Sequence, residues 1–291
     1  MPRQADRPER RWTLTERPGW RLVALCGLYF TQGLPFGFMF ITIAAVLADA
    51  GHSEGDIGGL LALAMLPWGF KWVLGPVFDR FGIASMGRRR PWILLAQVGL
   101  ILSLAALAFG PDPLTHDGWL AWGLLVVSGW SAMQDVAVDA LAVDLLRDTE
   151  RGRVNGFMYG SSYMGNALGG AGMGTVVAVS GLRTGFLVIA VVVAVVMLLP
   201  LLLRERHGER LLPWTKGKAS SNAPVPAKSM LSVARRLGHA FTLRSTIALA
   251  IVTVLLSIPS GFLTSFSTVL VVSELEWGME KYATWTGIAT W

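Results

Sequence analysis

Seven stretches of this chain are each long and apolar enough to cross a lipid bilayer as an α-helix. A spanning helix needs about 20 mostly apolar residues, and the first stretch is too long, and too far behind a polar arm, to be a cleaved signal peptide. An eighth stretch begins near Tyr282 and runs to Trp291. The sequence therefore predicts an all-α polytopic membrane protein embedded in a lipid bilayer. The seven stretches lie at 22–48, 57–79, 92–110, 119–144, 154–180, 184–203 and 246–272.

The composition excludes an ordinary soluble domain. Of the 291 residues, 53% are hydrophobic and 15% are charged, whereas a soluble domain carries about 25% charged residues. The single cysteine, Cys26, allows no disulfide within the chain, and its apolar surroundings are typical of a packed, unreactive thiol.

The distribution of positive charge predicts the orientation. Of the 25 Lys and Arg residues, all but Lys71, Arg183 and Lys281 lie in the N-terminal arm, in the loops after the second and fourth stretches, or in segment 204–245. Loops rich in Lys and Arg stay in the cytoplasm. The N-terminus and segment 204–245 are therefore expected to be cytoplasmic, in a multi-pass membrane protein. The same distribution accounts for the net charge of +6 without a nucleic-acid partner.

The order of the segments predicts a two-lobed transporter. We expect a cytoplasmic arm at 1–21, a six-helix lobe at 22–203, a basic cytoplasmic linker at 204–245 and an incomplete second lobe at 246–291. Residues 33–38 and 257–262 share a mid-span Pro followed by Gly and Phe. Proline breaks at matching positions of two halves indicate a midplane binding site. The alternative is a pair of ordinary kinked helices.

Four short motifs carry a resemblance to a known family. They are Phe70-Lys71, Asp79-Arg80, Gly87-Arg88-Arg89-Arg90 and Gln134-Asp135. Asp79-Arg80 and the basic cluster at 87–90 resemble the signature loop of the major facilitator superfamily. The four motifs together resemble the AmpG-type muropeptide permeases and the related acetyl-coenzyme A transporters. The resemblance covers residues 28–160.

The resemblance implies a twelve-helix core and proton-coupled uptake, across the inner (plasma) membrane, of a bulky anionic substrate such as a muropeptide or acetyl-coenzyme A. The chain stops within its eighth stretch. We therefore expect that a missing C-terminal lobe, or a second copy of the chain, is needed as a partner.

Three ionisable residues within the spans are candidates for proton coupling. Buried charges in a membrane are costly unless they are paired. Lys71 and Asp135 lie about 12–14 Å from the cytoplasmic ends of their helices, and Asp139 lies one turn from Asp135. We expect Lys71 to pair with one carboxylate while the other is protonated part of the time. The alternatives are a static ion pair, or contact of Lys71 with the substrate's anionic group.

A substrate cavity and a cytoplasmic gate complete the predicted site. For Gln134 and Asn166 the alternative to lining the cavity is a hydrogen bond between helices. For the gate charges the alternative is a purely topogenic role. The predicted cavity residues are Gln32, Gly33, Pro35, Gln134 and Asn166, and the predicted gate residues are Asp79, Arg80, Arg88, Arg89, Arg90 and Asp144.

Other classes of function fit the sequence less well. The fifth stretch is rich in glycine, but its small-xxx-small spacings, Gly165/Gly169 and Gly170/Gly174, favour helix packing over nucleotide binding. The four histidines lie in loops without companion ligands, so we expect neither a metal nor a cofactor. We expect a transporter and not an enzyme. A lipid-linked transferase and a non-transporting scaffold derived from a transporter are the alternatives.

Overall fold

The computed structural model describes residues 13–81, 83–215, 217, 235 and 238–269. The chain forms two units, Met1–Pro226 and Ala227–Trp291. The predicted eighth stretch and residues 1–12 of the predicted arm lie outside the described residues.

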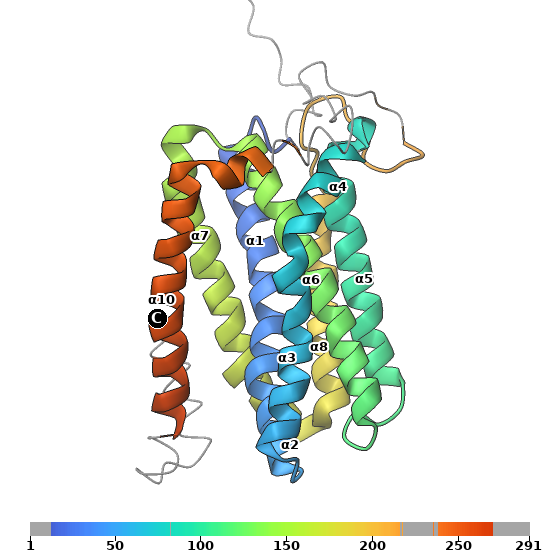
Figure 1. Ribbon diagram of the computed structural model, residues 1–291. Helices are drawn as coiled ribbons and strands as arrows, with labels where there is room; N and C mark the ends of the chain where they lie inside the picture. The colour runs from blue at the N-terminus through green and yellow to red at the C-terminus, as the bar shows by residue number, and fades with distance from the viewer. Residues whose placement is uncertain (1–12, 82, 216, 218–234, 236–237, 270–291) are drawn as a thin grey trace, which may run out of the picture. The chain divides into compact units, whose positions relative to one another are not determined.

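The described part of the first unit is a bundle of helices whose long axes run side by side (Figure 1). Thr13 and Arg204 form an isolated parallel β-bridge beside this bundle. In chain order the helical elements are α1 (Pro18–Gly37), η2 (Phe38–Ile43), α2 (Ala44–Asp49), α3 (Glu54–Phe70), η3 (Lys71–Val73), α4 (Leu74–Arg80), η4 (Ala84–Met86), α5 (Arg90–Phe109), α6 (Asp117–Leu145), α7 (Asp148–Ala167), η5 (Leu168–Gly172) and α8 (Met173–Leu202).

Five continuous helical stretches in the described residues are long and apolar enough to span a membrane. The fifth runs for 55 residues from Asp148 to Leu202. It changes direction at Gly181, whose φ of +80° is readily adopted by glycine. The break separates the predicted stretches 154–180 and 184–203, so the structure contains all six passages predicted up to residue 203. The chain is an all-α polytopic membrane protein.

In the second unit the long described helix is α10 (Arg244–Val269), which contains Pro259. It covers the predicted stretch 246–272 as far as residue 269. Of the repeated motif at 257–262, the side chains other than those of Ile258 and Pro259 lie outside the described residues.

Two π-helical turns interrupt the first and fifth passages and pack together. Pro35 has no N–H group to donate to the helical ladder, and the first passage continues as the π-helical η2 three residues later. The Thr42 hydroxyl donates to the carbonyl oxygens of Gly169 and Gly170 in η5, at 2.8 and 2.7 Å. The irregular turn η2, which follows Pro35, therefore makes a specific contact with the irregular turn η5.

The second passage, predicted as one uniform stretch, is broken at Lys71. Here α3 ends at Phe70, and the 3₁₀ turn η3 connects it to α4. Pro76 accounts for the break. Proline has no N–H group, so the carbonyl oxygen of the residue four positions before it loses its helical hydrogen bond. That residue is Trp72, in the middle of η3. The break places Lys71 in an irregular turn partway along the second passage.

Candidate functional site

Lys71 and Asp135 form an ion pair between η3 and α6. Lys71 Nζ lies 2.7 Å from Asp135 Oδ2, and the amide of Gln32 on α1 donates to Asp135 Oδ1, also at 2.7 Å. Asp135 is 4% exposed, whereas the Lys71 side chain is 40% exposed. The carboxylate is therefore held by two partners inside the bundle, while its ammonium partner reaches the surface of the unit.

Asp139, one turn from Asp135 on α6, has a different partner. It accepts a short hydrogen bond from the hydroxyl of Tyr29 on α1. Tyr29 is buried and packs edge-to-face on Tyr159 of α7, with ring centroids 5.7 Å apart. Lys71 thus pairs with Asp135, one of the two carboxylates expected as its partner, while Asp139 is held by Tyr29.

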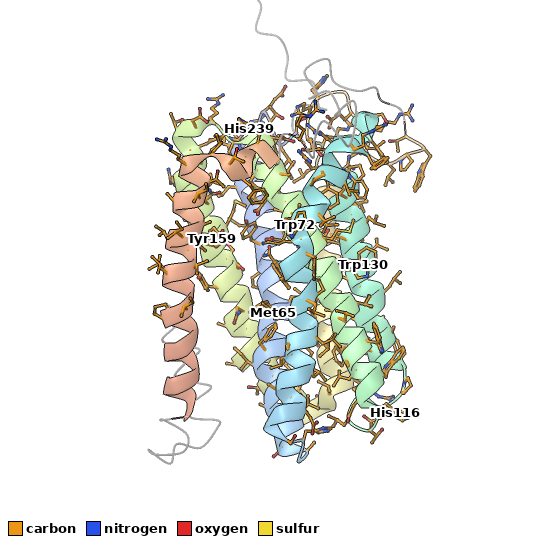
Figure 2. The ribbon with its side chains drawn as sticks, in the orientation of Figure 1. Met65, Trp72, His116, Trp130, Tyr159 and His239 are labelled. Carbon is orange, nitrogen blue, oxygen red and sulfur yellow. The ribbon has the colours of Figure 1, made fainter. Side chains whose placement is uncertain are left out.

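Aromatic side chains surround these two pairs. Lys71 Nζ lies 5.1 Å from the centroid of the Trp68 ring, and Trp68 packs edge-to-face on Phe36. Trp72 and Tyr159 are both more than half exposed, and Figure 2 shows them at nearly the same level along the bundle. The half-exposed Lys71 side chain therefore lies among aromatic rings, which supply apolar contact area.

The predicted cavity residues separate into two groups. Gln32 belongs to the ion-pair cluster. Gly33 and Pro35 are buried in α1, and Gln134, 1% exposed, donates to the carbonyl of Leu28 and the hydroxyl of Thr31. These three residues lie between packed helices and not on a cavity wall, so for Gln134 the structure matches the alternative of a hydrogen bond between helices.

Asn166 lies where α1 and α7 approach most closely. A Cβ atom built on Gly33 would lie 1.9 Å from the carbonyl oxygen of Ser162, and one on Gly37 would lie 2.0 Å from that of Asn166. A Cβ on Gly165 or Gly169 would likewise meet the backbone of α1. The Gly165/Gly169 spacing is therefore a packing motif, whereas a Cβ on Gly174 would meet nothing within 4 Å.

The charges predicted as a gate converge at the end of the bundle where α4 precedes α5. Arg88 lies 2.9 Å from Asp79, and Arg89 bridges Asp79 at 2.8 Å and Asp144 at 2.9 Å. Arg89 thereby joins the α4–α5 loop to the last turn of α6. We call the cluster of Asp79, Arg88, Arg89 and Asp144 the basic-end cluster.

Arg80 and Arg90 differ from the other predicted gate residues. Arg90 is 1% exposed and donates to backbone carbonyls of Met86, Pro200, Leu201, Arg210 and Leu211. It therefore anchors the end of α8 and the segment after it. Arg80 lies over the ring of Phe81, 5.3 Å from its centroid.

Glu205, just after α8, was not predicted and caps α5. Its buried carboxylate accepts the backbone N–H groups of Arg88, Arg89 and Arg90, at 3.1, 2.8 and 2.6 Å. A carboxylate at a helix N-terminus satisfies free N–H groups and the helix dipole. Burial nevertheless raises the pKa of Glu205 above its ordinary value. The folded lobe thus continues into the predicted linker, where Glu209 is also buried.

Arg21 and Glu150 form a second unpredicted link at the same end. Arg21 donates to both carboxylate oxygens of Glu150, at 2.7 and 2.9 Å, and the backbone N–H of Arg147 donates to one of them. The pair ties the first turn of α1 to the first turn of α7. Sequence spacing carries no signal for this pair, because its members are 129 positions apart. For Tyr29 a signal existed, since it lies one helical turn before Gln32.

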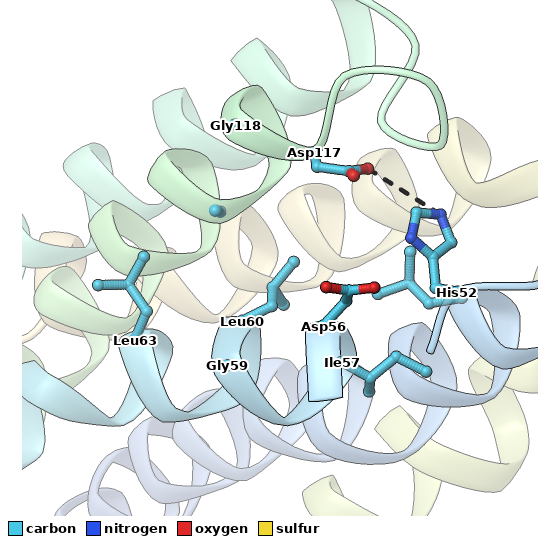
Figure 3. Close-up of a pocket in the computed structure, with 10 residues that line it drawn as sticks. His52, Asp56, Ile57, Gly59, Leu60, Leu63, Asp117 and Gly118 are labelled. Atoms are coloured by element: carbon cyan, nitrogen blue, oxygen red, sulfur yellow. Dashed lines mark ion pairs between the residues drawn. The ribbon is translucent and has the colours of Figure 1, made fainter. Parts of the chain in front are cut away.

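A pocket of about 300 Å³ lies at the opposite end of the bundle (Figure 3). His52 Nε2 and Asp117 Oδ1 lie 4.0 Å apart across it, and Asp56 stands between apolar side chains of α3. Among the described residues no group of three or more His, Cys, Asp or Glu is placed to hold a metal ion. The lining residues are Leu47, His52, Asp56, Ile57, Gly59, Leu60, Leu63, Asp117, Gly118 and Ala121.

Comparisons with known proteins agree with this architecture. The family model of the Major Facilitator Superfamily matches residues 25–290. An anhydromuropeptide permease of Escherichia coli K12 is 33% identical over 132 residues, which are 45% of this chain and 26% of that protein. A folate-biopterin transporter of Synechocystis is 28% identical over 185 residues, 61% of this chain and 36% of that protein. The chain thus matches about a quarter to a third of the length of these relatives.

A solved structure shares the fold at low sequence identity. A POT family transporter in complex with a thioalcohol-conjugated peptide superposes with a TM-score of 0.53 at 18% identity. The match covers 87% of this chain and 50% of that one.

Proposed function

The chain belongs to the Major Facilitator Superfamily, and on that premise we propose that it imports a bulky anionic solute, such as an anhydromuropeptide, together with protons. One observation carries the proposal: a buried carboxylate, Asp135, is paired with the partly exposed ammonium of Lys71 inside a membrane-spanning bundle. Ionisable groups at such depth are retained where they bind ions or substrate. The relative that acts as an anhydromuropeptide permease suggests the class of solute.

In the proposed chemistry, an anionic group of the solute competes with the Asp135 carboxylate for the Lys71 ammonium. An anionic group of the solute contacts the exposed side of Lys71 and weakens its bond to Asp135. Asp135, losing its counter-ion in a low-dielectric site, then takes up a proton. Release of the solute restores the pair and expels the proton. Asp139, held by Tyr29, lies one turn away as a second acceptor.

We also propose that the basic-end cluster closes the cytoplasmic side, and that the N-terminus lies in the cytoplasm of an inner-membrane protein. Arg89 is the central cation of the cluster, so Arg89→Gln would leave Asp79 and Asp144 without their shared partner. A second lobe, from the same polypeptide or from another copy, would cover the exposed aromatic residues near Lys71.

Orientation and gating are measured together with a membrane-impermeant thiol reagent. In a Cys26→Ser background, Glu16→Cys should react only from the cytoplasmic side and Thr115→Cys only from the outside. Arg89→Gln should increase labelling of cysteines placed deeper than the cluster. Labelling of Glu16→Cys from the outside would contradict the proposed orientation. Unchanged labelling of the deeper cysteines in Arg89→Gln would contradict the proposed gate.

The transport proposal is tested by uptake into proteoliposomes. Labelled anhydromuropeptide should accumulate when the outside is more acidic than the lumen, and a protonophore should abolish the accumulation. Asp135→Asn should lose the response to the pH gradient, whereas Asp112→Asn, an exposed loop carboxylate, should keep it. Uptake by Asp135→Asn that follows the pH gradient as the wild type does would refute the coupling role. Acetyl-coenzyme A as a competitor distinguishes the two solutes.

A further inference from the structure

The core of the first unit is divided into two apolar clusters by a layer of polar side chains. One cluster contains Leu34, Leu100 and Val127, and the other contains Leu28, Ile93 and Ala137. On each of α1, α5 and α6 the residues between these positions include polar side chains. We call Thr31, Gln97, Ser131 and Gln134 the polar layer.

The members of the polar layer lie at one level of the bundle. Gln134 donates to Thr31, which fixes the level of α1 against α6. Arg89 with Asp144, and Gly99 against Trp130, give the antiparallel register of α5 on α6. By that register Gln97 stands opposite residues 132–133. Ile93 and Leu100, one turn before and after Gln97, belong to the two clusters, so the Gln97 side chain lies on the same inward stripe.

Polar atoms of this layer lack hydrogen-bond partners within the described part of the protein. Gln97 is fully buried, and neither its Nε2 nor its Oε1 has a partner. Ser131 Oγ and Gln134 Oε1, in side chains that are 1% exposed, are in the same state. These atoms include both donors and acceptors. Buried polar groups in folded proteins are nearly always satisfied, and ordered water supplies the partner where protein does not.

We infer that the polar layer is a binding site for internal water, held by the Gln97 amide of α5, the Ser131 hydroxyl and the Gln134 carbonyl of α6. The donors and acceptors of these groups match the two donors and two acceptors of a water molecule. Gln32 follows Thr31 on α1: its Nε2 donates to Asp135, and its Oε1 is also buried without a partner among the described residues. The inference holds whether or not the protein couples transport to protons.

Hydroxyl-radical footprinting of the full chain in lipid nanodiscs tests the site. X-ray radiolysis of a bound water modifies the side chains around it, even when bulk solvent cannot reach them. Leu28, Ile93 and Leu100 should be modified several-fold faster than Leu104 and Leu107, which are equally buried within a single apolar cluster. Equal modification of both sets would overturn the inference.

Gln97→Met is the matched variant, because methionine keeps the length of the side chain and removes both polar atoms. In this variant the footprint at Ile93 and Leu100 should fall to the level of Leu104, and the midpoint of thermal unfolding should not rise. Unchanged modification of Ile93 and Leu100 in Gln97→Met would contradict the inference that the Gln97 amide binds the water. A higher midpoint would mean that the wild-type amide is dry and unpaired, which contradicts bound water.

Discussion

Tyr29 of α1 donates a hydrogen bond to Asp139 of α6, one helical turn from the carboxylate that pairs with Lys71. Asp139 is exposed in the described unit, whereas Asp135 is buried. The two carboxylates therefore have separate partners and separate environments, and substitutions can distinguish their contributions.

The Tyr29–Asp139 contact predicts strong coupling between two substitutions. Tyr29→Phe and Asp139→Ala each remove this hydrogen bond, so each should lower the free energy of unfolding by about 1–2 kcal/mol. The double variant should be little less stable than either single variant, because the interaction can be lost only once. Chemical unfolding in detergent micelles measures the cycle. Additive losses would show that Tyr29 stabilises the protein through its packing on Tyr159 and not through the hydrogen bond.

The Lys71–Asp135 pair predicts a rescue. Lys71→Met leaves a buried carboxylate with Gln32 alone, and it should destabilise the protein by about 1–3 kcal/mol, the cost of an unsatisfied charged group. Adding Asp135→Asn removes that charge, so the double variant should recover most of the loss. Melting temperatures of the two single variants and the double variant decide this. If the double variant is less stable than Lys71→Met, Lys71 is not the main partner of Asp135.

The sequence could predict features that depend on local pattern or on position along one helix. Apolar length gave the spans, and counting residues from the helix ends placed Lys71 and Asp135 at the same depth. The partners of Asp139 and Asp135 on α1, Tyr29 and Gln32, depend on how α1 rotates against α6, and no single-helix pattern determines that rotation.

The role of Glu205 also arises from tertiary structure. A polar, charged segment after the sixth passage is typical of a linker, yet three N–H groups of a distant helix N-terminus hold this one carboxylate. Gly87, with φ of +90°, lies so close that a Cβ there would be 2.6 Å from Glu205. The glycine of the Gly87-Arg88-Arg89-Arg90 motif is explained only once this contact is known.

Glu209 predicts a dependence of stability on pH. Burial and the neighbouring Glu205 carboxylate raise the pKa of Glu209 from 4.5 to about 7. A raised pKa in the folded state contributes stability below the unfolded value, and this stability is lost as the pH rises through the folded value. The loss is at most about 1.4 kcal/mol per pH unit for one proton.

The melting temperature should therefore fall between pH 5 and pH 8. Glu209→Gln, which stays neutral, should reduce the fall, while Glu205, whose pKa burial also raises, retains part of it. Asp49→Asn, at an exposed position, is the control for the loss of one acidic charge. A profile unaffected by Glu209→Gln would mean that Glu209 is not protonated in this range.

The glycine contact between α1 and α7 predicts opposite outcomes for two substitutions in one helix. A Cβ on Gly165 would lie 2.3 Å from the carbonyl oxygen of Phe30, whereas a Cβ on Gly160 meets nothing within 4 Å. Gly160→Ala should stabilise the protein by about 0.5–1 kcal/mol, because alanine is the better helix former. Gly165→Ala should destabilise it, because backbone atoms at 2.3 Å must move apart and α1 must separate from α7. Thermal unfolding of the two variants in the same detergent gives the comparison. Equal shifts of the same sign would contradict close packing of α1 on α7 at Gly165.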